Sequence, residues 1–209
     1  MKNKNGFTLI EVLSVIIIMG VIMIIAVPAV TKYIFKSDKS VYASNVSAFV
    51  ESVRAKYEMK EYGALLKDDE IMVVPIGHII LEKGDAKNSP YGEYDFTRSY
   101  VLIVPEKSAY NFYATVVDKK NVGIINTPPN KLDEYAVKLE INVNEIPILT
   151  GYNNPLSTYI YEESYKLPDG TDAVKKKVYK RSDVRAIEGE GINQGEYAYI
   201  FKDTGTLLD

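Results

Sequence analysis

The segment NGFTLIEVLSVIIIMGVIMIIAVP, residues 5–28, contains Glu11 as its one charged residue. From Val12 to Val30 the chain carries no charge. As an α-helix, this run would be about 28 Å long, close to the thickness of the hydrocarbon core of a bilayer. The run therefore predicts a membrane-embedded helix with a carboxylate in its first turn.

A cleaved secretory signal peptide is the alternative interpretation, with Lys2 and Lys4 as its basic start. The apolar part of such a peptide usually has about 7–15 residues and ends at a small-residue cleavage site. This run is longer, and it continues without a break into an amphipathic pattern. A retained membrane helix is therefore favoured.

Beyond the apolar run, hydrophobic residues recur every three or four positions. This stripe consists of Tyr42, Val46, Phe49, Val50, Val53 and Tyr57. The period predicts an amphipathic helix whose charged residues lie on a solvated face. No proline or glycine interrupts residues 29–62, so we expect one helix from about Thr8 to Tyr62, with Gly63 as its stop.

The remaining residues, 63–209, are expected to form a β-rich head. Segments rich in β-branched and aromatic residues predict strands at 100–104, 110–117, 122–126, 135–143, 157–165, 175–184 and 196–201. DKKN (118–121) and LPDGTD (167–172) predict turns, whereas residues 64–99 are interpreted as a variable connection. The predicted fold class is α+β: a long N-terminal helical spine, membrane-embedded in its first half, packed on an antiparallel sheet.

Composition argues against several classes of function. A net charge of −3 and a pI of about 5.4 argue against a nucleic-acid partner. The chain has no cysteine and a single histidine, His78, so we expect neither an enzyme nor a bound cofactor or metal. KDDE (67–70) and DGTD (169–172) offer oxygen ligands for a hard cation, but neither follows the EF-hand spacing.

The run KKKVYKRSDVR, residues 175–185, is a candidate contact for a polyanion. Its basic residues are Lys175, Lys176, Lys177, Lys180, Arg181 and Arg185. Such a run could bind phosphate polymers in a salt-dependent way. The alternation around Val178 and Val184 favours the other interpretation, a strand with one solvated face.

The N-terminal arrangement closely resembles the class III leader and first helix of type IV pilins and pseudopilins. The resemblance rests on Lys2 and Lys4, Gly6, the following FTLIEV, and the apolar helix with Gly20 and Pro28. It implies that prepilin peptidase cuts between Gly6 and Phe7 and methylates the new amine of Phe7. It also implies that Glu11 is the family's buried glutamate, and that Gly20 and Pro28 are positions where the helix loosens in a filament.

The resemblance also implies an organisation and a role. A leader (1–6) would precede a spine (7–62), membrane-spanning over 7–30 and amphipathic over 31–62, and a globular head (63–209). The chain would be a structural subunit of a surface filament for adhesion, aggregation or motility. A pseudopilin of a type II secretion or DNA-uptake machine is the alternative. Implied partners are other pilins in a helical filament, the prepilin peptidase, an assembly platform and motor, and the membrane before assembly. The chain would be a single-pass membrane protein before assembly, and it would lie in a pilus at the cell surface after assembly.

The carboxylate of Glu11 has a physical explanation within this resemblance. A charge in hydrocarbon costs several kcal/mol unless it is paired. Cleavage would create a cationic amine on Phe7, which Glu11 of a neighbouring subunit could neutralise in a bundle of spines. The alternative is an interfacial glutamate at a helix N-terminus, which the helix dipole tolerates.

Overall fold

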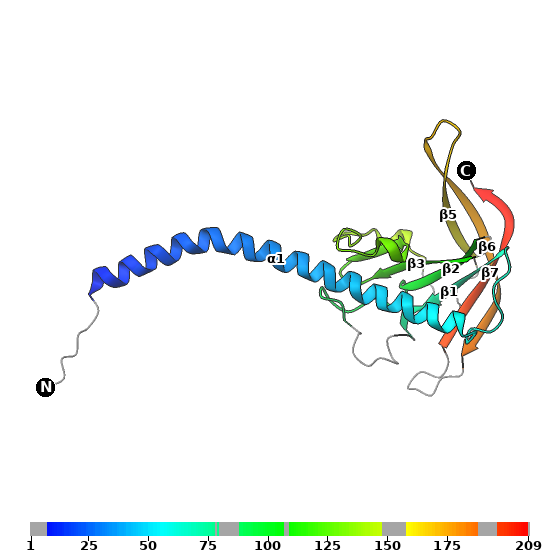
Figure 1. The fold of residues 1–209 in the computed structure, drawn as a ribbon, viewed down its shortest axis with the longest axis horizontal. Coiled ribbons are helices and arrows are strands. Elements are labelled where there is room, and N and C mark those ends of the chain that lie inside the picture. Colours follow the sequence, from blue (N-terminus) through cyan, green and yellow to red (C-terminus); the bar gives the residue numbers. More distant parts are fainter. Residues whose placement is uncertain are drawn as a thin grey trace. The chain divides into compact units, whose positions relative to one another are not determined.

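The computed structural model describes residues 8–77, 79, 88–106, 109–147, 158–187 and 196–208. The chain divides into two compact units, Met1–Asp38 and Lys39–Asp209. Helix α1 (Leu9–Glu58) begins in the first unit and ends in the second. The second unit contains the β-strands of the described part, drawn as arrows in Figure 1.

The strands form one seven-stranded sheet in the order β4-β3-β2-β1-β7-β6-β5. Every neighbouring pair is antiparallel. The bounds are β1 (Glu70–Pro75), β2 (Tyr100–Glu106), β3 (Ala109–Val117), β4 (Gly123–Thr127), β5 (Thr158–Lys166), β6 (Asp172–Ile187) and β7 (Glu196–Leu208), with short 3₁₀ helices η1 (Pro129–Lys131) and η2 (Val143–Glu145). The predicted α+β class, a long N-terminal helix with an antiparallel sheet, is confirmed.

The predicted apolar stripe of the helix is buried along its whole length. Its residues share one hydrophobic cluster, the helix-side core, with alternate residues of the sheet such as Met72 and Ile103. The Tyr42 hydroxyl also lies 3.1 Å and 3.2 Å from the carbonyl oxygens of Val116 and Val122, to which it donates. Helix and sheet are therefore joined by apolar burial and by one buried hydroxyl.

Helix α1 ends at Glu58, four residues before the predicted end at Tyr62. Lys60 adopts a left-handed backbone with φ 60°. The amide of Glu61 donates to the carbonyl of Lys56, and that of Lys60 to the carbonyl of Tyr57. These two bonds form a Schellman motif, a common helix end that usually employs glycine. The prediction failed because a lysine took the position expected of Gly63.

Strand β1 lies at the centre of the sheet, between β2 and β7. The interpretation of residues 64–99 as a variable connection was therefore wrong for this segment. Ile71 and Val73 face one core, and Met72 and Val74 face the other. Since both faces are buried, the strand is apolar from Ile71 to Pro75 and lacks the alternation of a half-exposed strand.

A second hydrophobic core covers the other face of the sheet, and it requires the sheet to curl. The Tyr100 hydroxyl on β2 lies 2.9 Å from the Tyr159 hydroxyl on β5, and their ring centroids are 6.0 Å apart. Three strands separate β2 from β5. In a flat sheet these two strands would lie about 19 Å apart. The tyrosines therefore meet inside a concave face.

The predicted strand at 135–143 was wrong. The Asp133 carboxylate accepts hydrogen bonds from the amides of Tyr135 and Ala136, which favours a turn. One bridge then joins Lys138 to Gly123 of β4. Val137 enters the helix-side core and Ile141 enters the second core. The alternating residues therefore serve two cores, because the segment wraps around the sheet edge.

The other predicted strands are confirmed, as are the turns that join two of the hairpins. β2, β3, β4, β5, β6 and β7 contain most or all of the predicted ranges. In the β3–β4 turn, Asn121 has φ 63°. The buried Asp118 carboxylate accepts from the amides of Lys120 and Val122 and from the Ser89 hydroxyl. Asp118 thus secures both this turn and the loop that precedes β2.

Phe201→Ala should destabilise the second compact unit, residues 39–209, by about 3–5 kcal/mol, because the ring is fully buried in the second core. Ile160→Ala is the control on the same sheet, since Ile160 is 50% exposed. It should change the free energy of unfolding by less than about 0.5 kcal/mol. Urea unfolding followed by circular dichroism measures both. Equal effects would contradict the proposed packing.

The head should lose stability at alkaline pH through its buried tyrosines. Burial raises the pKa of Tyr94 to about 12, and it raises the pKa of Tyr100 and Tyr159 above the ordinary value. A raised folded-state pKa gives stability that is present below the unfolded value, about 10, and is lost as pH rises beyond it. Urea midpoints at pH 8 and pH 11 should differ, and the difference should shrink in Tyr94→Phe. An unchanged difference would exclude Tyr94 as a contributor.

Candidate functional site: the N-terminal end of helix α1

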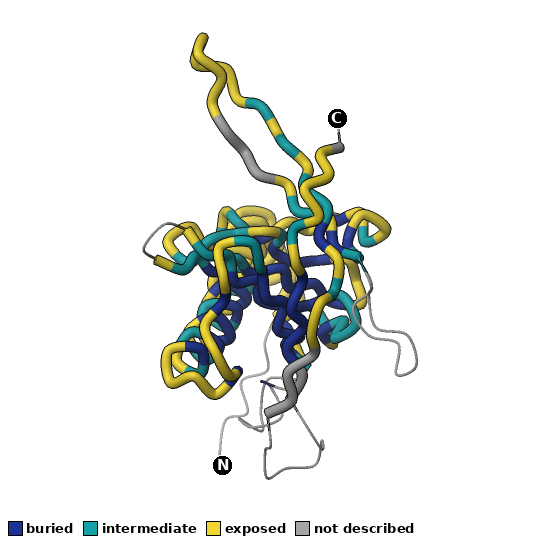
Figure 2. Tube along the Cα trace, turned by 90° about the vertical axis from the view of Figure 1, so that its right-hand side faces the viewer, coloured by how far each residue is buried: buried dark blue, intermediate teal, exposed yellow. Residues whose placement is uncertain are grey.

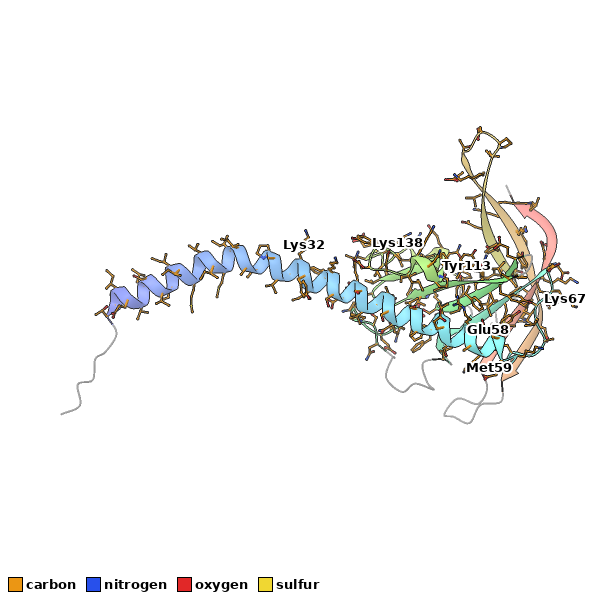
Figure 3. The ribbon with its side chains drawn as sticks, in the orientation of Figure 1. Lys32, Glu58, Met59, Lys67, Tyr113 and Lys138 are labelled. Atoms are coloured by element: carbon orange, nitrogen blue, oxygen red, sulfur yellow. The ribbon has the colours of Figure 1, made fainter. Side chains whose placement is uncertain are left out.

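The N-terminal half of α1 presents an apolar surface on all sides. Residues 8–36 are exposed, and the helix contains a window of mean hydropathy 2.9 with no buried residue. After Glu11 the next charged residue is Lys32, which Figure 3 labels on the helix. By length and composition this segment can cross a membrane, which agrees with the predicted transmembrane helix.

Glu11 is held by Thr8 at the start of the helix. Its Oε2 accepts from the Thr8 amide at 2.7 Å and from the Thr8 hydroxyl at 2.8 Å. In return, the Glu11 amide donates to Thr8 Oγ1 at 3.3 Å. This reciprocal arrangement is a capping box, which satisfies amides that the first helical turn leaves without partners.

The sequence interpretation missed the role of Thr8. The signal was present, because TLIE (8–11) has a threonine followed three residues later by a glutamate at the start of an apolar run. The box shows how a separate chain tolerates the Glu11 carboxylate. Both bonds from Thr8 reach the same oxygen, Oε2, and the positive end of the helix dipole adds to them.

Hydroxyl groups further along the apolar segment bond to their own helix. Ser14 Oγ donates to the Ile10 carbonyl at 2.7 Å, and Thr31 Oγ1 donates to the Val27 carbonyl at 2.8 Å. These bonds satisfy polar atoms that lipid could not. The polar side chains of the segment are thus compatible with hydrocarbon.

Gly20 and Pro28 both lie inside α1. A Cβ added to Gly20 would have nothing within 4 Å, so packing within this chain does not require the glycine. Pro28 has no amide hydrogen, so the helix lacks one of its regular hydrogen bonds at this turn. The role of both residues as points of helix loosening stays a prediction.

Five residues singled out from the sequence lie outside the described residues. These are Lys2 and Lys4 of the predicted leader, Gly6 and Phe7 at the predicted processing site, and His78.

The candidate polyanion residues on β6 are divided between the two faces of that strand. Lys176 pairs with Glu162 at 3.3 Å, and Lys175 lies opposite Glu163 in the strand register. Lys180 lies opposite Lys202 of β7, whose ammonium is 3.1 Å from Asp69. Because successive residues of a strand alternate between its faces, Lys177 and Arg181 lie on the face opposite to that of Lys176 and Lys180. The Arg185 side chain lies outside the described residues. This division favours a solvated strand over one basic surface.

The two candidate cation segments are engaged by their own chain. Asp69 pairs with Lys202, and the Asp169 carboxylate accepts from the amide and hydroxyl of Thr171. Within the described ranges, no group of three or more acidic or histidine side chains could hold a metal ion.

Comparison with known proteins identifies the N-terminal segment. Residues 1–27 match the family model described as the prokaryotic N-terminal methylation motif. No match was found among curated proteins or solved structures. The matched segment contains Thr8 and Glu11 of the capping box and the first part of the apolar helix. The chain therefore carries, at residues 1–27, the N-terminal methylation motif of a class III prepilin, followed by a long apolar helix.

Proposed function

We propose that this protein is a structural subunit of a type IV pilus, processed by prepilin peptidase and polymerised into a surface filament. The observation that carries the proposal is Glu11, a carboxylate at the start of a charge-free apolar helix within a prepilin methylation motif. The role is structural rather than catalytic. Before assembly the apolar helix anchors the subunit in the membrane.

The proposed chemistry begins with cleavage between Gly6 and Phe7. The new amine carries a positive charge, which methylation preserves. Glu11 of an adjacent subunit then neutralises this amine when the spines pack together. In a separate subunit the carboxylate has the capping box with Thr8, which supplies hydrogen bonds but no opposite charge. Assembly therefore gains an ion pair, and the pair sets the axial offset between spines.

A pseudopilin that forms a short piston in a secretion or DNA-uptake machine is the second candidate. The methylation motif supports it equally, because both kinds of prepilin share that motif. Mass spectrometry of sheared surface fibres separates the two. An abundant chain supports the pilus subunit, and its absence from fibres supports the pseudopilin.

Gly6→Val should leave the leader attached and abolish assembly, because the peptidase needs the space that a glycine leaves. Gel mobility of the membrane-bound protein reports cleavage, and shearing of cells reports fibres. Asn5→Val is a neighbouring control that leaves Gly6 in place and should be processed. Fibres built of uncleaved Gly6→Val subunits would overturn the proposed processing.

Glu11→Val should be cleaved and inserted normally but should not enter fibres. Each subunit addition would leave one Phe7 amine unpaired, and loss of one partner of a buried pair costs about 3–5 kcal/mol. Glu11→Gln should be nearly as defective, because it retains the shape but loses the charge. Each variant is expressed in a strain lacking the native gene, and membrane and sheared fractions are compared.

Thr8→Val is the matched control for the capping alternative. It removes the hydroxyl of the capping box and retains the Glu11 charge. If Glu11 acts as the partner of an amine, Thr8→Val should still form fibres. If Thr8→Val and Glu11→Val fail alike, Glu11 serves as a helix cap, and the proposed amine pairing is wrong.

A further inference from the structure

Within the described residues, the two edges of the sheet differ in how they are covered. At one edge, β4 is short, and Gly123 exchanges two backbone hydrogen bonds with Lys138, at 2.9 Å and 2.8 Å. At the other edge, β5 is the terminal strand of the order, and it forms a hairpin with β6. Figure 2 shows this hairpin extending beyond the buried part of the head, with an exposed tip. Terminal strands offer backbone groups to which another strand can add.

The hairpin carries two ion pairs on one face. Lys176 Nζ lies 3.3 Å from Glu162 Oε1, and Lys166 Nζ lies 3.4 Å from Asp172 Oδ1. Since alternate residues of a strand share a face, positions 162 and 166 of β5 lie on one side of the hairpin. The acid comes first on β5 and the base comes four residues later. When a second β5 runs antiparallel to the first, the acid of each strand can therefore lie opposite the base of the other.

We propose that β5 pairs antiparallel with β5 of a second copy of this chain, with position 164 of each copy at the two-fold axis. Glu162 of each copy then lies opposite Lys166 of the other. Across the four strands the charges follow the order Lys176, Glu162, Lys166 and Asp172, the last two from the second copy. Their signs alternate, and the symmetry creates this row twice.

The charges of β5 also select this register. A two-fold axis normal to the sheet places residues of the same face opposite each other, so their numbers are both even or both odd. The charged residues of β5 are Glu162, Glu163 and Lys166. Glu162 and Lys166 are the one acid and base of β5 whose residue numbers are both even or both odd. Registers with an axis at 162, 163 or 166 place like charges together, and like charges directly opposite are destabilising.

The contact links two copies and then closes, because a two-fold interface uses the same surface on both partners. It therefore joins neighbouring filaments, or copies in the membrane, rather than extending a filament. The ion pairs are exposed, with side-chain exposures of 46% and 55% for Lys176 and Glu162. Exposed pairs contribute little individually. The contact therefore depends on copies held at high local concentration. It does not require that the proposed polymer forms.

A cysteine test suits this chain, because it has no cysteine of its own. In full-length Ser164→Cys, the two Cα atoms would lie about 4.5–5.5 Å apart, within the range for a disulfide. Val174→Cys is the matched control, since Val174 is the register partner of Ser164 on β6 and is 56% exposed. Two copies of that position would be about 14 Å apart across three strand spacings.

Cells and sheared fibres are treated with a mild oxidant and analysed on non-reducing gels. Ser164→Cys should give at least five-fold more covalent dimer than Val174→Cys. Equal yields of dimer from both variants would overturn the proposal, as would the absence of dimer from Ser164→Cys.

Charge variants in the Ser164→Cys background test the register. Glu162→Lys alone and Lys166→Glu alone should each lower the dimer yield, because each places like charges opposite each other. Coexpression of the two variants, one with an affinity tag, should restore a mixed dimer, since both pairs across the two-fold contact are then of unlike charge. Within each hairpin the substituted residue faces a like charge, Lys176 or Asp172, in the single-variant and the mixed dimers alike. If the yield of covalent dimer is the same with and without these charge changes, this register is excluded.

Discussion

Burial of the apolar stripe of α1 against the curled sheet is the interaction on which the rest of the head depends. A helix with six large apolar residues on one face cannot expose them to water without aggregation, and a sheet with two apolar faces needs a cover on each. The second half of α1 covers one face, and Tyr42 adds hydrogen bonds to two carbonyls at the β3–β4 end. The exposed residues of the same helical segment are polar or small, apart from Val41, which is 48% exposed.

The other face of the sheet is covered by curling rather than by a helix. β5 and β6 bring Tyr159 and Tyr179 into the core of Ile71, Val73 and Phe201, and the segment around Ile141 closes the β4 side. This arrangement explains how a chain without cysteine stabilises a head of this size. Its tyrosines supply large buried rings, and the hydroxyls of Tyr100 and Tyr159 satisfy each other where water is excluded.

In the proposed function, Glu11 at the N-terminal end of α1 has two states, one in the separate chain and one in the filament. In the separate chain, the Glu11 carboxylate completes a capping box with Thr8. This local bonding lowers the cost of a carboxylate at the membrane boundary, yet it leaves the charge without a counterion. A carboxylate satisfied in this way is tolerated in a subunit and still gains from an amine of a neighbour, as the methylation motif at residues 1–27 leads us to propose.

Elements whose signal is local could be predicted from the sequence. The charge-free run to Val30, the stripe from Tyr42 to Tyr57, and six of the strands follow from composition and period alone. The other features depend on contacts between segments that are distant in the sequence. The centre of the sheet is β1, and its apolar IMVVP (71–75) became recognisable as part of a strand only when β2 and β7 lay on either side. The alternation at 135–143 was equally misleading, because Val137 and Ile141 enter different cores around the sheet edge. Periodicity reports how many faces of an element are buried, and the neighbours that bury them come from distant parts of the chain.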